Sequence, residues 1–159
     1  MDKPLFPLID IYESYYVDLV PAEINLSEAV ATEILTEDNH SELYDAQGNV
    51  WHYRLVSKEI KNTFISRLFA YFVNDSKHNA MPVWTRVREY HIEDLKDVLK
   101  DCVDKDEDLL TQYEEAEVIK KDISIAFSFD DLVAVLNKYV FDVNEEALLT
   151  EQEKREKGF

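Results

Sequence analysis

The sequence contains very little glycine and cysteine, and both shortages exclude kinds of site. Its two glycines cannot build the glycine-rich loops that hold phosphates, so P-loop and dinucleotide-binding motifs are absent. The single cysteine, Cys102, rules out a disulfide within the chain. Cys102 has acidic neighbours, which raise the pKa of a thiol, and it lies on the apolar side of a helical pattern. We therefore interpret Cys102 as a buried core residue and not as a nucleophile.

Long hydrophobic runs and known catalytic motifs are also missing. No apolar run approaches the ~18 residues that span a bilayer, and the first residues lack the basic start and apolar core of a secretory signal. We therefore expect a cytoplasmic protein without a membrane partner. The four histidines form no H-E-x-x-H pair, and no G-x-S-x-G elbow occurs. We accordingly predict no catalytic residue, no metal ligand and no cofactor.

Basic residues are scarce relative to acidic ones. There are 17 lysines and arginines against 34 aspartates and glutamates, for a formal net charge of −17. Most of the excess lies in residues 1–53 and 92–122, whereas residues 54–91 are net positive. Such a charge repels nucleic acid and anionic membranes and attracts basic proteins. Solubility is the alternative explanation, because a single-sign excess needs no partner.

The length and the composition predict one folded domain. The chain has 159 residues, of which 46% are hydrophobic, with 9 Tyr, 8 Phe and 2 Trp. This is enough apolar material for a core despite the charge. We predict a single α+β domain over residues 1–150 and a charged, frayed tail over residues 151–159.

A β-hairpin over residues 41–57 is the clearest local pattern. Gly48–Asn49 is expected to form its turn, between segments rich in β-forming residues. Alternating apolar residues predict further strands near 83–90 and 123–129. The side of the second hairpin strand that is expected to face the core carries Trp51, Tyr53 and Leu55.

Four to five helices are expected to pack against this small antiparallel sheet. One follows Ser27 as its N-cap and ends near residues 38–40, and another opens at the capping-box variant Ser128–Asp131. A third, over residues 58–75, has a phenylalanine-rich face that we expect to be buried. If that face were exposed in the isolated chain, the protein would instead be a subunit of a larger assembly. The remaining helical patterns cover residues 91–103, 108–121 and 144–158.

The acidic stretch 104–115, DKDEDLLTQYEE, resembles the ligand spacing of a calcium-binding EF-hand loop. Its first, third, fifth and twelfth residues are acidic. Its sixth position, however, is Leu109, where an EF-hand needs glycine, and no second loop exists. We therefore interpret the stretch as a helix start near Asp106, on an acidic face.

A second mixed pattern lies on the strand near 83–90, where Trp84, Arg86, Arg88 and Tyr90 share one face. Aromatic and arginine side chains together can bind nucleic acid. Because the net charge opposes that use, we expect these arginines to pair with acids of a neighbouring strand.

Two functional hypotheses follow. The first is an acidic, non-enzymatic interaction protein that inhibits or neutralises a basic protein, such as a nuclease or a nucleic-acid-binding protein. Immunity proteins and DNA-mimicking inhibitors work in this way, and the analogy is one of type. The alternative is an enzyme or small-ligand binder whose site combines dispersed residues such as His52, Arg54 and His91. For the first hypothesis the candidate contact residues are Glu37, Asp38, Glu42, Asp45, Asp101, Asp104, Asp106 and Asp108, with Tyr44 and Tyr113 as aromatic anchors.

Overall fold

The chain has an α+β architecture, as predicted. Among the residues that the structure describes, five α-helices accompany a five-stranded antiparallel sheet and a two-stranded sheet. This computed structural model describes residues 2–35, 40–70, 76–106, 110–111 and 114–139. The chain divides into two compact units, namely Met1–Glu13 with Val20–Tyr90, and Ser14–Leu19 with His91–Phe159.

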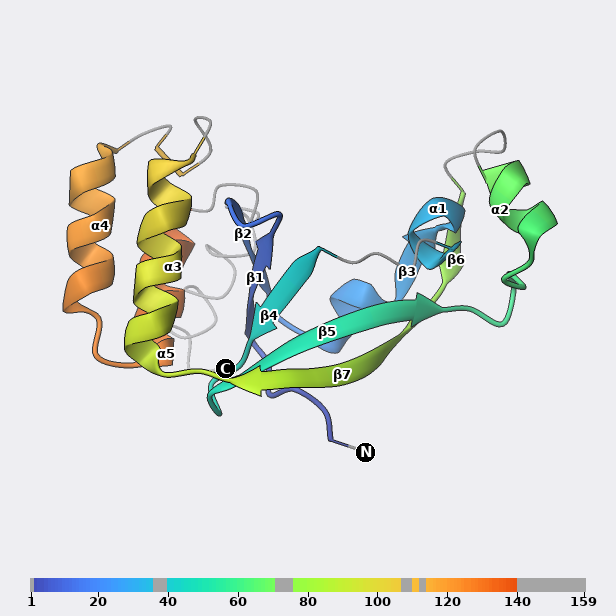
Figure 1. Ribbon diagram of the computed structural model, residues 1–159, viewed down its shortest axis with the longest axis horizontal. Coiled ribbons are helices and arrows are strands. Elements are labelled where there is room, and N and C mark those ends of the chain that lie inside the picture. The colour runs from blue at the N-terminus through green and yellow to red at the C-terminus, as the bar shows by residue number, and fades with distance from the viewer. Residues whose placement is uncertain (1, 36–39, 71–75, 107–109, 112–113, 140–159) are drawn as a thin grey trace, which may run out of the picture. The chain divides into compact units, whose positions relative to one another are not determined.

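The larger sheet contains the predicted hairpin. Its strand order is β2-β1-β4-β5-β7. Strands β4 and β5 form the hairpin, and β7 confirms the strand expected near 83–90. Strands β5 and β7 run alongside each other as a long antiparallel pair (Figure 1). The five strands are β1 (Leu8–Tyr12), β2 (Tyr16–Val20), β4 (Ser41–Tyr44), β5 (Asn49–Val56) and β7 (Met81–Glu89).

Gly48 closes the hairpin turn. Its φ of 82° lies in the left-handed region that side chains disfavour. The backbone N–H of Asp45 donates to the carbonyl of Asn49 at 3.0 Å, and that of Gly48 donates to the carbonyl of Asp45 at 3.2 Å. Asn49 is therefore the first residue of β5, and the turn lies just before it.

Among the described residues, the core of the first unit includes two apolar clusters. Trp51 and Tyr53 face the larger cluster and Leu55 packs against the smaller one, as predicted. The ring of Trp84 lies edge-on to Phe6, at 5.9 Å between centroids. The buried members of the larger cluster are Leu8, Val20, Leu43 and Trp51, and those of the smaller cluster are Ala29, Ile34 and Ala80.

The helix predicted to follow Ser27 is largely wrong. A 3-10 helix, η1 (Glu23–Leu26), is followed by strand β3 (Glu28–Val30), and only then by the short α1 (Ala31–Leu35). Ser27 does not cap a helix start, because its hydroxyl donates to the carbonyl of Ile24 at 2.7 Å. Strand β3 pairs with the distant β6 (Lys77–Asn79), and this long-range pairing overrides the local helical pattern.

The helix predicted over 58–75 starts later than expected, and residues 71–75 lie outside the described residues. Helix α2 (Phe64–Ala70) is preceded by Thr63, whose hydroxyl accepts the N–H of Ser66 at 3.1 Å. The prediction that its phenylalanine-rich face is buried is wrong for the part that the structure describes, because Phe64 and Leu68 are exposed. A stripe of apolar residues identifies one face of a helix but not what covers that face.

Among the residues that the structure describes, three α-helices belong to the second unit. They are α3 (Ile92–Asp104), α4 (Ala116–Ile125) and α5 (Phe129–Tyr139). Helix α3 packs against α4, and α4 packs against α5. Cys102 is fully buried as expected, and burial raises the pKa of its thiol to about 11. Across both units, no helix among the described residues is long and apolar enough to span a bilayer. The core side chains of the second unit include Leu95, Leu99, Ile119, Ile123, Leu132 and Leu136.

The strand predicted over 123–129 is wrong. Residues 123–125 end α4, and α5 begins at Phe129. Ile119 and Ile123 are both buried, so a helical spacing of four accounts for the pattern. The capping box is confirmed, since the N–H of Asp131 donates to the hydroxyl of Ser128 at 3.1 Å. The helix expected to start near Asp106 begins only at Ala116.

Candidate functional site

The structure separates the predicted contact residues into three groups. Glu42 lies in β4 and pairs with Arg88. Tyr44 and Asp45 are buried at the hairpin. The remaining described acids lie at the end of α3. This last group consists of Asp101, Asp104 and Asp106. Four further predicted residues, Glu37, Asp38, Asp108 and Tyr113, lie outside the described residues.

Asp45 organises the hairpin turn from the interior. It is fully buried, and its carboxylate accepts the indole N–H of Trp51 at 2.8 Å. The same carboxylate accepts the backbone N–H groups of Asn49 at 2.9 Å and Gln47 at 3.0 Å. The Tyr90 hydroxyl donates to the Asp45 carbonyl at 2.6 Å. Asp45 therefore holds the turn together, and its buried side chain is not exposed to a partner.

Glu42 is the centre of a bonded cluster. Its two carboxylate oxygens accept hydrogen bonds from two guanidinium nitrogens of Arg88, at 2.6 and 2.9 Å. The hydroxyl of Tyr44 donates to Glu42 at 2.8 Å and accepts from Arg88 at 3.2 Å. These hydrogen bonds, above all the one from Arg88, hold the pKa of Glu42 below its ordinary value. Burial raises the pKa of the Tyr44 hydroxyl. The cluster ties β4 to β7, and buried Tyr44 offers no anchor to a partner.

The Glu42–Arg88 pair makes stability depend on pH. Because the pKa of Glu42 is lower in the folded than in the unfolded state, the pair stabilises the fold above the unfolded pKa. That stability is lost as the pH falls through the folded pKa. Both side chains are over one third exposed, so we expect Arg88→Gln to cost only about 0.5–1 kcal/mol at pH 7, and less near pH 3. Urea unfolding at the two pH values measures this difference.

Arg86→Gln is the matched control, because Arg86 lies on the same strand and pairs with the exposed Glu89 at 2.8 Å. Its loss should change stability by less than about 0.5 kcal/mol at either pH. An equal effect of the two variants, or an Arg88→Gln cost that grows toward low pH, would contradict the assignment. Both arginines thus pair with acids, but only Arg88 pairs with an acid of another strand, as expected, whereas Arg86 pairs with Glu89 of its own strand.

Acidic side chains surround an open hollow at the junction of α3 and α4. The hollow has a volume of about 640 Å³. Glu114 and Glu115, which contribute to it, were not among the predicted contact residues, although they end the acidic stretch 104–115. The lining residues are Val103, Asp104, Asp106, Thr111, Glu114, Glu115 and Ala116.

The acids at this junction differ in how far they are neutralised. Lys120 lies against Asp104 at 2.8 Å and against Glu117. In the described part of the chain, no lysine or arginine pairs with Asp101, Glu114 or Glu115, which are all exposed. The open carboxylates therefore lie at the end of α3 and just before α4. We call Asp101, Glu114 and Glu115 the open acids.

Asp106 has a local structural role. One of its carboxylate oxygens accepts the N–H of Thr111 at 2.9 Å and the hydroxyl of Thr111 at 2.8 Å. These bonds fold the chain back on itself between α3 and α4. Across the described residues, no group of three or more His, Cys, Asp or Glu side chains is arranged to hold a metal ion.

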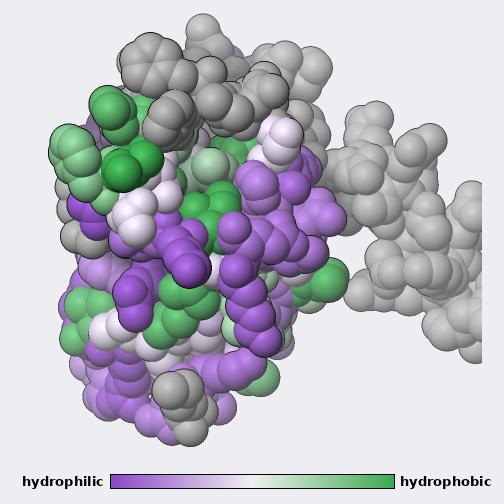
Figure 2. Space-filling model, turned by 90° about the vertical axis from the view of Figure 1, so that its right-hand side faces the viewer, coloured by the Kyte–Doolittle hydropathy of each residue, from purple (hydrophilic) through white to green (hydrophobic). Residues whose placement is uncertain are grey.

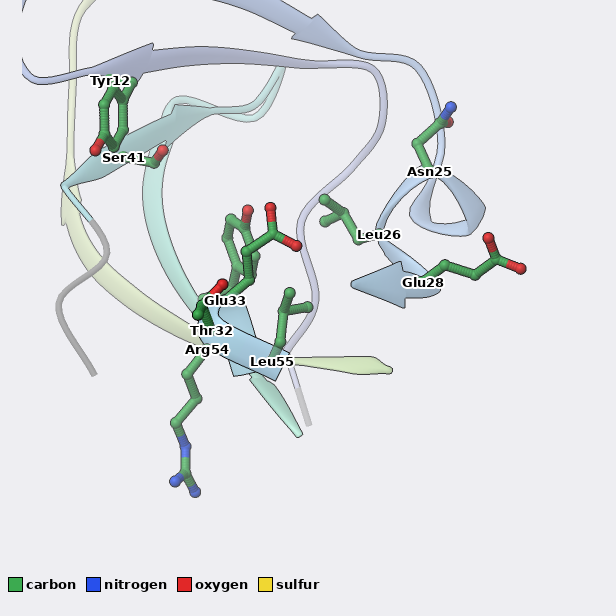
Figure 3. Close-up of a pocket in the computed structure, with 10 residues that line it drawn as sticks. Tyr12, Asn25, Leu26, Glu28, Thr32, Glu33, Ser41, Arg54 and Leu55 are labelled. Carbon is green, nitrogen blue, oxygen red and sulfur yellow. The ribbon is translucent and has the colours of Figure 1, made fainter. Parts of the chain in front are cut away.

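The first unit contains a separate cavity of about 480 Å³ between η1, α1 and β5 (Figure 3). Several of its polar groups are already bonded to the chain. Glu33 accepts the N–H of Val30 at 2.9 Å, and Asn25 accepts that of Ala22 at 3.1 Å. The side chain of Arg54 points away from the cavity (Figure 3). Because Glu33 and Asn25 are engaged within the chain and Arg54 points away, the open acids are the stronger candidate site.

Comparisons with known proteins identify no relative. No protein-family model matches the chain, and neither curated proteins nor solved structures give a match.

Proposed function

We propose that the protein is an acidic, non-enzymatic interaction protein that binds a basic protein partner through the α3–α4 junction. The observation that supports this proposal is the exposure of the open acids beside a hollow, without neutralising partners among the described residues. A nuclease or a nucleic-acid-binding protein is the expected partner, because such proteins carry a basic face that matches this charge. Blocking that face would inhibit the partner.

The net charge and the local charge support the proposal in different ways. A formal charge of −17 attracts a basic protein from a distance and speeds the encounter. Recognition then needs a surface whose carboxylates are not already paired within the chain. Asp101 and Glu115 meet this condition, whereas Glu42 is bonded to Arg88 and Asp45 is buried. Of the predicted contact residues that the structure describes, Asp101 remains the best candidate, because Asp104 pairs with Lys120 and Asp106 is bonded to Thr111.

The test compares the protein with its Asp101→Lys/Glu115→Lys variant. This variant reverses two open charges without removing a side-chain hydrogen bond or an ion pair found among the described residues, whereas a change of Asp106 would disturb Thr111. The protein is used to retain binding proteins from a lysate at low salt, and association with the retained protein is then measured. We expect a basic protein that is released as salt rises, and an association rate about tenfold lower for the variant.

The matched control is Asp2→Lys/Glu28→Lys, which changes the net charge equally at exposed positions of the first unit. It should reduce the rate only slightly, since those residues lie outside the proposed surface. Equal slowing by both variants would show that net charge alone governs binding. Retention of no basic protein would contradict the proposed function itself.

A further inference from the structure

The first unit exposes a hydrophobic patch on α2. Phe64 is 81% exposed, Ile65 63% and Leu68 53%, and we call these three residues the α2 patch. Figure 2 shows the face that is on the right of Figure 1, where α2 is drawn, and hydrophobic residues lie there among hydrophilic ones, several of them at the upper left. Large apolar residues that are exposed together on one helix mark interaction surfaces more often than single exposed ones do.

Basic residues surround the α2 patch. Lys58, Lys61 and Arg67 are all exposed around it. Of the nearby acids among the described residues, Glu59 is bonded to His78 at 3.2 Å and to Asn79 at 2.8 Å, and Glu33 lies on α1, which packs against α2. The patch therefore combines apolar side chains with positive charge, in a chain whose overall charge is strongly negative. An acidic apolar surface is its electrostatic complement.

The second unit exposes a different hydrophobic pair where α4 meets α5. Ile125 is 61% exposed and Phe127 is 91% exposed. We call this pair the α4–α5 corner. Its backbone is held in place, because the N–H groups of Phe127 and Ser128 both donate to the carboxylate of Asp131, at 2.9 and 3.0 Å. Phe127 is thus presented to solvent on a bonded turn, at the opposite end of α4 from the open acids.

Acidic residues surround this corner. Asp130 and Asp131 are exposed on the first turn of α5. The largely buried Lys96 binds Glu93 at 2.8 Å and the carbonyl of Ser124 at 3.4 Å, which places Glu93 beside the end of α4. Lys121 is the exposed base of the same helix end. The corner therefore pairs apolar side chains with net negative charge.

We propose that the α2 patch of one molecule binds the α4–α5 corner of a second copy of this chain. Both surfaces offer apolar side chains to bury, and the basic residues around the α2 patch complement the acidic residues around the corner. Pairing of two α2 patches would instead bring the exposed Lys58 and Lys61 of both copies together, at an electrostatic cost. Because the two surfaces are different, the contact is head-to-tail, and it propagates into a ring or a chain. Two small patches bury little area, so the contact is weak and reversible.

Two variants with complementary defects test this contact. Phe64→Ser/Ile65→Ser removes the α2 patch, and Ile125→Ser/Phe127→Ser removes the corner. Sedimentation velocity over a wide concentration range should show reversible self-association of the unchanged protein, weakened at high salt. For each variant alone, the dissociation constant should rise about 100-fold. An equimolar mixture of the two should form a dimer that grows no further, because each molecule retains one intact surface.

The control variant is Ile24→Ser, which removes an exposed hydrophobic residue elsewhere in the first unit and should leave self-association unchanged. Asp101→Lys/Glu115→Lys should also leave self-association unchanged. A failure of the self-association proposal can therefore be distinguished from a failure of the proposed function. Circular dichroism confirms that each variant is folded. A monomer at every concentration would overturn the proposal, as would a corner variant that still dimerises alone or a mixture that stays monomeric.

Discussion

Asp45→Ala is expected to destabilise the first unit by about 3–5 kcal/mol, although Asp45 lies in a surface hairpin. The substitution removes the acceptor of the Trp51 indole N–H and of two backbone N–H groups, and Asp45 is fully buried. Buried donors that lose their acceptor pay the full cost of desolvation. Urea unfolding, monitored by tryptophan fluorescence, measures the loss.

Two further substitutions bracket that effect. Asp45→Asn keeps the shape and one acceptor but loses the charge, so about half of the destabilisation is expected. Asp130→Ala removes an exposed aspartate and should cost less than about 0.5 kcal/mol. A loss below 1 kcal/mol for Asp45→Ala, close to that of Asp130→Ala, would mean that the turn holds without its carboxylate.

Leu99→Ala should have the second large effect, of about 3 kcal/mol, on the second unit. Leu99 is fully buried on α3, which packs against α4, and truncation leaves a cavity that the helices close only in part. Urea unfolding followed by circular dichroism at the helical band measures the change. Val118→Ala, at a partly exposed position of α4, is the control and should cost well under half as much. Equal costs would show that α3 packs less tightly than its burial indicates.

The features that the sequence predicted correctly depend on local interactions. Gly48 alone allows the hairpin turn, and the Ser128–Asp131 pair caps α5 through bonds between close neighbours. The wrong predictions of secondary structure fell where contacts between residues distant in the sequence determine whether a segment is a strand or a helix. Strand β3 exists because β6 pairs with it. Ile123 belongs to a helix because α3 and α5 pack on α4 and bury one of its faces. A short apolar run fits both the period of a strand and that of a helix, so its spacing alone could not distinguish the two structures.

For the candidate site, too, the sequence predicted only what does not depend on the folded chain. The sequence indicated that acids are abundant, but charge alone does not reveal burial or pairing. Asp45 is buried and Glu42 is bonded to Arg88, while Glu114 and Glu115 are open. Only the folded structure distinguishes a carboxylate that holds the chain together from one that is free for a partner. An acidic pair directly before a helix was the signal that could have identified the last two.

The distribution of the chromophores makes the two units separately visible in solution. Both tryptophans, Trp51 and Trp84, belong to the first unit. The three longest described helices, α3, α4 and α5, belong to the second. Intrinsic fluorescence therefore follows the melting of the sheet, while far-ultraviolet ellipticity follows mainly that of the helices. One denaturation curve recorded with both probes shows whether the two halves of the chain unfold cooperatively, without any label or substitution.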